Sequence, residues 1–157
     1  MRAHWETREM ATYNLVVAKS GIKLKLHQDQ NPSFDGQVRD PQAAGTRGLV
    51  RTIANPSSSG MTITVSGNAL PIDIVVSTLQ SYAGRPVFDK TGLSEMFDVR
   101  LVFFLEASGG TPQATLSDPV GALLATAIEE QLGLKLESAK GPVEVLVIDH
   151  VERPSEN

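Results

Sequence analysis

The sequence predicts an α+β fold with two layers, in which two helices cover one face of a small mixed β-sheet. Three observations support this prediction. Two segments carry apolar residues at helical spacing, and a glycine follows each of them. Short β-rich segments lie between and around them. From Met61 onward the predicted order is strand, helix, strand, strand, helix, strand, strand.

The two helices are predicted over residues 71–83 and 119–132. Pro71 and Pro119 suit the first helical position, where a missing N–H costs nothing, and Asp118 suits the N-cap. Gly84 and Gly133 then follow, each able to take the left-handed conformation that ends a helix. The predicted buried stripes are Ile72, Val75, Val76, Leu79 and Tyr82 or Ala83 in the first helix, and Val120, Leu123, Leu124, Ala127, Ile128 and Leu132 in the second.

The strands around these helices are predicted from β-branched content and alternation, at residues 61–65, 85–89, 96–105, 134–137 and 143–148. Strand 96–105 is the longest. Its first half alternates, which predicts one wet face, and its second half is apolar on both faces. A turn at Lys140 and Gly141 is expected to separate the last two strands.

One domain is expected, in four parts. Residues 1–27 are predicted to form strands, with a hairpin between residues 13–18 and 23–26 that turns at Gly21. Residues 28–60 are rich in proline, glycine and serine and predict a long irregular or disordered loop. Residues 61–152 form the predicted core, and residues 153–157 a frayed tail.

Composition excludes several classes of protein. The chain has 157 residues, 41% of them apolar, and no cysteine, which excludes disulfides, thiolate catalysis and cysteine-based metal sites. It contains no apolar run long enough for a transmembrane helix, and its first eight residues lack the apolar stretch expected of a signal peptide. The net charge of −4 argues against nucleic acid as the main partner. Residues 1–51 hold 8 Lys and Arg against 5 Asp and Glu, which we interpret as a solvated surface rather than a functional basic patch.

The sequence contains few residues at the spacing that catalytic or metal-binding sites require. His4, His27 and His150 are far apart in sequence and lack ligand spacing, so they are expected at the surface or at strand edges. Asp149 and His150 are neighbours on a predicted strand and therefore point to opposite faces, which argues against a catalytic dyad. The serines of residues 57–59 lie in no nucleophile elbow. No cofactor is expected.

Three carboxylates surround the predicted turn at Gly92. A carboxylate pair among Asp89, Glu95 and Asp98 could support acid–base chemistry. The structural interpretation is stronger, because Asp89 is well placed to accept turn N–H groups and Gly92 to take a positive φ. Arg85 and Lys90 could attract an anion. However, they follow the C-terminal end of the predicted helix, whose partial negative charge does not favour anion binding.

The second half of the chain resembles the small N-terminal domain of secretins and TonB-dependent receptors in its order of elements. The sequence motif GRPVFDKTGL at residues 84–93 is more specific. It resembles the signature of a family of uncharacterised, mostly exported acidobacterial proteins. Matching segments recur at residues 4–9 with 13–19, at residues 130–137 and at residues 143–154. The signature positions are Gly84, Arg85, Pro86, Asp89, Lys90, Thr91, Gly92, Leu93, Gly133 and Asp149. This resemblance implies an envelope or extracellular setting and transfers no catalytic residue.

Three functions are therefore compared. The first is a non-enzymatic interaction module of the bacterial cell envelope, in which strand 143–148 or strand 96–105 pairs with a strand of an envelope protein. The second is a sensor domain that holds a small ligand in an apolar pocket with a few polar groups. The third and least favoured is an enzyme, which predicts strongly perturbed carboxylates or histidines in a cleft. Oligomeric state is left open.

Overall fold

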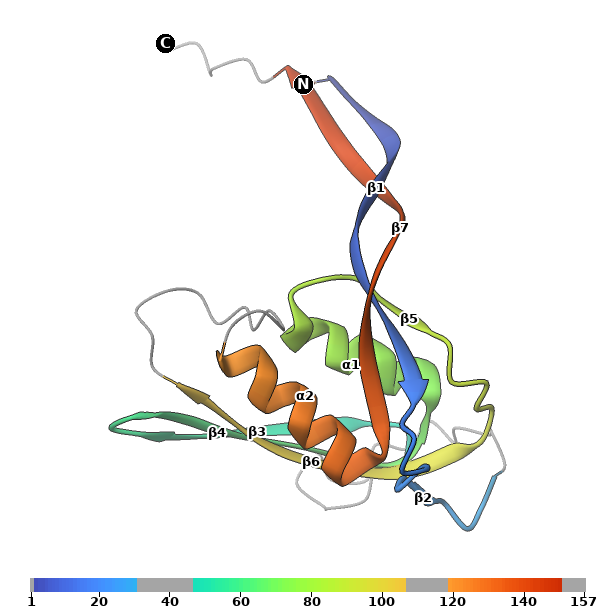
Figure 1. The fold of residues 1–157 in the computed structure, drawn as a ribbon, viewed down its shortest axis with the longest axis vertical. Helices are drawn as coiled ribbons and strands as arrows, with labels where there is room; N and C mark the ends of the chain where they lie inside the picture. The colour runs from blue at the N-terminus through green and yellow to red at the C-terminus, as the bar shows by residue number, and fades with distance from the viewer. Residues whose placement is uncertain (1, 31–46, 107–118, 151–157) are drawn as a thin grey trace.

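The computed structural model describes residues 2–30, 47–106 and 119–150 (Figure 1). The elements of these residues follow one another in this order: β1 (Arg2–Val17), β2 (Lys25–Leu26), β3 (Val50–Ser57), β4 (Gly60–Pro71), α1 (Ile72–Ala83), β5 (Val87–Asp89), β6 (Met96–Glu106), α2 (Pro119–Leu132) and β7 (Leu134–His150). The predicted α+β class is confirmed. The strands form two sheets, of order β5-β1-β7 and β2-β6-β4-β3.

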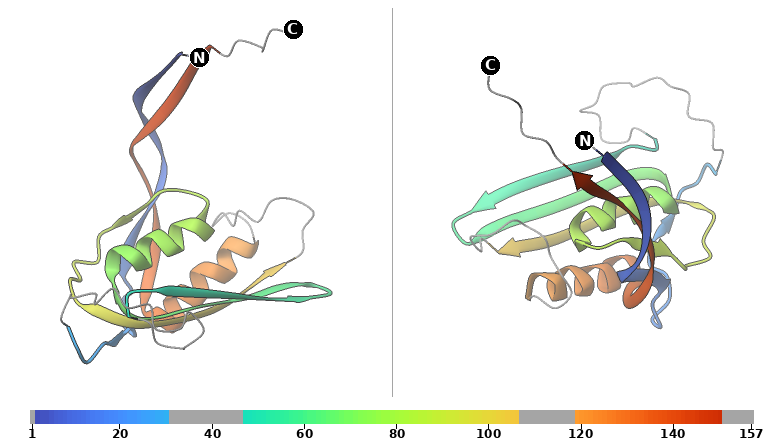
Figure 2. Two further views of the ribbon diagram at one scale, coloured as in Figure 1. Left: turned by 180° about the vertical axis from the view of Figure 1, so that it is seen from behind. Right: turned by 90° about the horizontal axis from the view of Figure 1, so that it is seen from above.

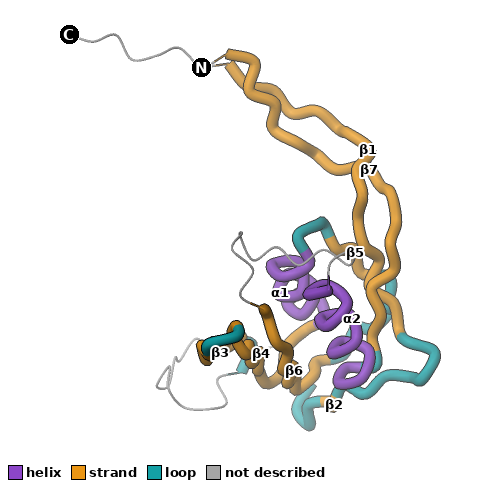
Figure 3. Tube along the Cα trace, turned by 60° about the vertical axis from the view of Figure 1, so that its left-hand side comes forward, coloured by secondary structure: helices purple, strands orange, loops and turns teal. Residues whose placement is uncertain are grey.

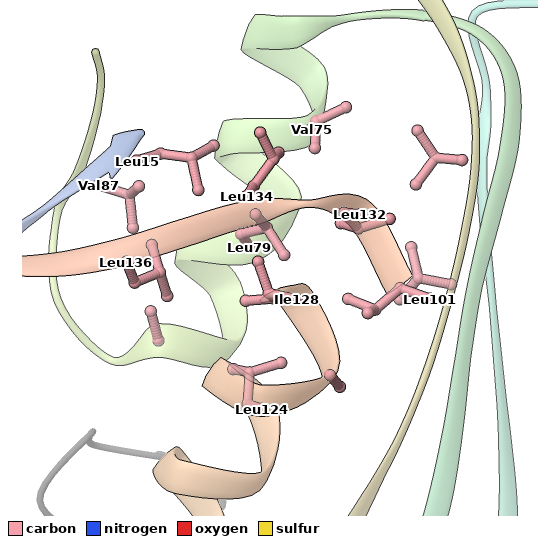
Figure 4. Close-up of a cluster of buried hydrophobic side chains, with 14 of the residues drawn as sticks. Leu15, Val75, Leu79, Val87, Leu101, Leu124, Ile128, Leu132, Leu134 and Leu136 are labelled. Carbon is pink, nitrogen blue, oxygen red and sulfur yellow. The ribbon is translucent and has the colours of Figure 1, made fainter. Parts of the chain in front are cut away.

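Both helices lie on one face of the four-stranded sheet, and the base of β1 and β7 closes the side of the core (Figures 1 and 2). Side chains from both sheets and both helices meet there (Figure 4). Leu15 of β1, Leu79 of α1, Ile128 of α2 and Leu101 of β6 are each at most 2% exposed. The core is therefore shared by elements from the whole length of the chain.

The helix boundaries agree closely with the prediction. Pro71 is the N-cap of α1, with extended φ and ψ of −67° and 156°, and so precedes the helix instead of opening it. Gly84 and Gly133 take φ values of +68° and +66°, which confirms their predicted role as helix stops. Asp118 lies outside the described residues. Of the predicted stripe on α2, Leu123 is exposed, whereas Leu124, Ala127, Ile128 and Leu132 are buried.

The predicted N-terminal hairpin is wrong. Strand β1 pairs along its length with β7, in register from Ala3 opposite Ile148 to Val17 opposite Leu134. Lys25 and Leu26 pair with β6 instead of returning along β1. The turn at Gly21 exists, but it directs the chain away from β1 because a much longer partner, β7, occupies that edge.

The turn predicted at Lys140 and Gly141 is also wrong. Strand β7 continues through both residues, with Gly141 opposite Met10 of β1. A lysine–glycine pair is only a local turn signal, and here a ladder that spans nearly all of β1 keeps the segment extended. The last two predicted strands are therefore one.

The irregular loop predicted at residues 28–60 is corrected at its end. Residues 50–57 form β3, which pairs with β4 through a tight hairpin from Ser57 to Gly60. Strand β3 tolerates Pro56 because it lies at the edge of its sheet. Residues 31–46 of this loop and the tail 153–157 lie outside the described residues.

A two-stranded ribbon extends from the body. Beyond the short pairing with β5, residues 2–10 of β1 and 141–150 of β7 continue together away from the helices, and we call this segment the arm (Figures 1 and 3). Figure 1, the left view of Figure 2 and Figure 3 show that it stands clear of the four-stranded sheet. Both ends of the described chain lie at its far end.

Candidate functional site

Residues 84–93, which we call the support segment, contact residues 13–15 of β1, next to the end of the arm. The C=O of Pro86 accepts a hydrogen bond from Tyr13 N–H, and the N–H of Lys90 donates to the C=O of Leu15, both at 2.9 Å. Between them, β5 pairs in parallel with residues 13–15 of β1. The guanidinium carbon of Arg85 lies 5.4 Å from the ring centroid of Tyr13, within range of a cation–π contact. These residues fix the base of β1 against the body.

The rest of this segment forms a turn around Gly92. Asp89 Oδ1 accepts hydrogen bonds from the N–H of Thr91 at 2.8 Å and from its hydroxyl at 2.7 Å. Gly92 takes a φ of +71°, and the half-buried Leu93 packs against the core. Asp89 thus serves the turn itself, which is a structural role. Asp149 lies on β7 near the end of the arm, and its side chain is outside the described part of the structure.

His27 and Asp98 form a pair that sequence reasoning missed. His27 Nδ1 lies 2.7 Å from Asp98 Oδ1, although the two residues are 71 positions apart. The same oxygen accepts a hydrogen bond from the N–H of Ala69 at 3.2 Å. Ala69 is 2% exposed and takes a φ of +49°, at a bulge where the register of β4 against β6 shifts. Asp98 thus holds a strained bulge in place.

The electrostatics of Asp98 favour its charged form. Partial burial would raise the pKa of this carboxyl, but the hydrogen bonds from His27 and Ala69 and the charges of His27 and Lys25 together lower it below its ordinary value. No group of three or more potential metal ligands occurs among the residues that the structure describes. Ser57 Oγ donates to the C=O of Gly60, 3.1 Å away in the β3–β4 hairpin.

Backbone geometry shows which edges of the arm are open. Tyr13 N–H and Leu15 C=O point toward β5, and therefore away from β7. Along an antiparallel ladder, the N–H and C=O groups of successive residues point alternately toward the partner strand and away from it. The ladder of β1 and β7 is uninterrupted from Ala3 to Val17. It follows that Ala3, Trp5, Thr7 and Glu9 turn their backbone groups outward on one edge. Pro142, Glu144, Leu146 and Ile148 do the same on the other edge.

The arm also exposes apolar side chains. Trp5 is 69% exposed, Leu146 50% and Ile148 52%. Trp5 and Leu146 lie directly opposite each other in a non-hydrogen-bonded pair, the kind that brings side chains closest together. Trp5, Leu146 and Ile148 share one face of the ribbon. Leu146 lies directly opposite Trp5, and Ile148 is two positions along the same strand from Leu146, so its side chain points to the same side.

The other candidate edge, that of β6, is covered. Strand β4 pairs with one side of β6, and β2 pairs with the start of the other. Farther along, the side-chain amide of Gln131 from α2 accepts from Val102 N–H at 2.9 Å and donates to Val102 C=O at 2.7 Å. Of the two strands considered for partner pairing, β7 has an open edge, whereas the free edge of β6 is covered at its start and at Val102.

A concavity of about 810 Å³ lies over the outer face of the four-stranded sheet and extends to the end of α2, where Gln131 and Leu132 line it. Its described lining includes Lys23, Lys25, Arg51 and Arg100, and one acidic residue, Asp98. Hydroxyl groups of Thr64 and Ser66 line its floor. This volume is within the range of small-ligand sites.

Comparison with known families gives one match. Residues 1–151 match the model of a family described as a protein of unknown function, DUF3738. The chain belongs to the DUF3738 family. This DUF3738 match covers both the support segment 84–93 and the described arm. Searches of curated proteins and of solved structures find no match.

The predicted membership in a family of unknown function is confirmed. The export of its members and the likeness to the secretin and TonB domain stay predictions. Among the residues described for this DUF3738 chain, no helix is both long and apolar enough to cross a membrane.

Proposed function

We propose that this chain is a non-enzymatic protein-interaction module of the bacterial cell envelope and that the arm is its binding element. The observation that carries the proposal is the pair of open backbone edges beside exposed apolar side chains at the tip of the arm. An isolated two-stranded ribbon is marginally stable in water, so an arm of this kind gains stability when a partner covers it. The envelope setting rests on the family resemblance.

The partner is an extended segment of an envelope protein that adds a strand to the β7 edge. Outward N–H and C=O groups of Glu144, Leu146 and Ile148 offer main-chain hydrogen bonds, while Leu146 and Trp5 offer apolar contact. Pro142 has no N–H, so continuous pairing starts beyond it, toward the tip. Glu144 favours an uncharged or basic residue opposite it.

Trp5 supplies a direct test, because it is the single tryptophan of the chain and lies on the arm. Immobilised protein is exposed to a protein extract of a bacterial cell envelope, and the captured protein is purified and titrated back. We expect the Trp5 emission to shift to shorter wavelength, and the amides of Glu144, Leu146 and Ile148 to become protected from hydrogen exchange.

Leu146→Pro removes an outward N–H without removing a β1–β7 hydrogen bond, and we expect it to weaken capture by roughly tenfold or more. Leu146→Ala keeps the N–H and should have a smaller effect. Leu123→Ala is the matched control, because Leu123 on α2 is 44% exposed, close to the 50% of Leu146. Undiminished capture by Leu146→Pro, or equal loss with Leu123→Ala, contradicts the proposal.

A small-ligand sensor is the second candidate function, and the concavity on the outer sheet face favours it. The two candidates use different parts of the molecule, since the arm contributes no described residue to the lining of the concavity. Each can therefore be tested with the other left intact.

A further inference from the structure

We infer that the concavity on the outer face of the four-stranded sheet binds a small oxyanion, a molecule that carries phosphate or carboxylate groups. This inference goes beyond the proposed role of the arm. It rests on the register of three neighbouring strands and on the balance of charge in the concavity.

The register aligns two arginines on either side of a serine. Arg100 of β6 lies opposite Ser66 of β4, and Ser66 lies opposite Arg51 of β3. All three project away from the helices, because the alternate residues Leu101 and Val65 are buried beneath them. Two strand spacings put the arginine backbones roughly 10 Å apart, so both guanidinium groups can reach an anion above Ser66.

Both arginines are available to a ligand. Arg51 and Arg100 are exposed, and neither has an ion-pair or hydrogen-bond partner among the described residues. Ser66 is half-buried between them and offers a hydroxyl donor. This row differs from the arm, where Arg8 is paired with Glu6 at 2.9 Å.

The rest of the concavity adds positive charge. Lys23 and Lys25 line it beyond Arg100, and Lys23 Nζ donates to the C=O of Glu130 at 3.1 Å. Asp98 is the acidic residue in the described lining, and His27 and Ala69 already occupy one of its oxygens. The described part of the lining therefore holds an excess of positive charge, in a chain whose net charge is −4. That contrast favours a ligand with two or more negative charges.

Isothermal titration calorimetry of the whole chain at low salt tests the inference, with inorganic pyrophosphate and citrate as probes. We expect saturable binding of at least one probe, weakened by added salt because exposed charges are screened. Arg51→Gln and Arg100→Gln should each lower the affinity by roughly tenfold, as expected for loss of a charge-assisted hydrogen bond.

Arg8→Gln is the control, because it removes the same charge from the arm. Leu146→Pro, also in the arm, should leave the affinity unchanged, so this inference and the arm proposal can fail separately. Pyrophosphate binding alone assigns a phosphate ligand and citrate binding alone a carboxylate ligand; either supports the inference. It is overturned if neither probe binds saturably, or if Arg8→Gln weakens binding as much as Arg100→Gln does.

Discussion

Single residues hold the junctions of this fold, and Gly133 is the clearest case. It ends α2 with a φ of +66°, and its C=O accepts a hydrogen bond from Ala18 N–H at 2.9 Å. A Cβ at this position would collide with the backbone of Gly21 and Lys23. The glycine is therefore required both for its conformation and for the close approach of the 18–23 turn.

Gly133→Ala is expected to destabilise the protein by about 3 kcal/mol or more, because left-handed strain adds to displaced backbone. Gly92→Ala is the matched control. Gly92 has a φ of +71°, but a Cβ there would meet no atom of the described residues within 4 Å beyond its own chain neighbours. It should cost only about 1–2 kcal/mol. Urea unfolding measures both values, and equal losses would show that the close approach is unimportant.

Asp98 makes stability depend on pH. Its pKa is lowered in the folded protein, so the carboxylate stabilises the fold fully above its ordinary pKa of 3.8, and this stabilisation is lost as the pH falls through the lower folded value. Asp98→Asn should cost about 1–3 kcal/mol at neutral pH, through the lost charge-assisted hydrogen bonds.

The measurement is urea unfolding of both proteins between neutral pH and about pH 2.5, a range that spans the ordinary carboxyl pKa. The difference between them should shrink below about pH 4, since other carboxylates titrate in both proteins. Glu144→Gln in the arm serves as a control and should show no such convergence. A difference that stays constant in acid would contradict the assigned role of Asp98.

At the scale of elements, pairing between segments far apart in the chain decides how long each strand is and which of its edges is covered. Residues 134–137 and 143–148 each read as a short strand, yet both belong to β7 because β1 pairs with their whole length. The edge of β6 is protected by a side chain, with Gln131 of α2 bonded to both backbone groups of Val102. Edges left open to solvent invite pairing with other chains.

Gln131→Ala should therefore expose the Val102 edge and cost about 1 kcal/mol. Hydrogen exchange followed by NMR should show a faster amide at Val102 and an unchanged amide at Val65, which lies in an interior strand. Gln131→Glu keeps the acceptor but loses the donor, and its effect should be smaller at neutral pH. An unchanged Val102 amide in Gln131→Ala would show that the helix does not protect this edge.

At the scale of the whole molecule, the structure separates a packed body from an arm. The body buries its core between the four-stranded sheet, the two helices and the base of β1 and β7. The support segment 84–93 joins the two parts through its pairing with residues 13–15. The proposed protein-binding edge and the proposed anion site lie on different parts, so substitutions in one are expected to act independently of the other.

Local patterns in the sequence determined the α+β class, the two helices, their glycine stops and the long strand β6. These features depend on interactions between residues close in sequence, or on one buried face, and so leave a periodic signal. The turn built on Asp89 was predictable for the same reason, since its hydrogen bonds span two residues.

Only the tertiary structure decided the pairing of β1 with β7, the placement of β3, the His27–Asp98 pair and the alignment of Arg51 with Arg100. Each joins residues far apart in the chain, and single-sequence patterns carry no information about which distant segments become neighbours. The turn signal at Lys140 and Gly141 was overridden because a long cross-strand ladder outweighs a local preference. Both proposed sites depend on such pairings, which set the open edge of the arm and the row of basic side chains.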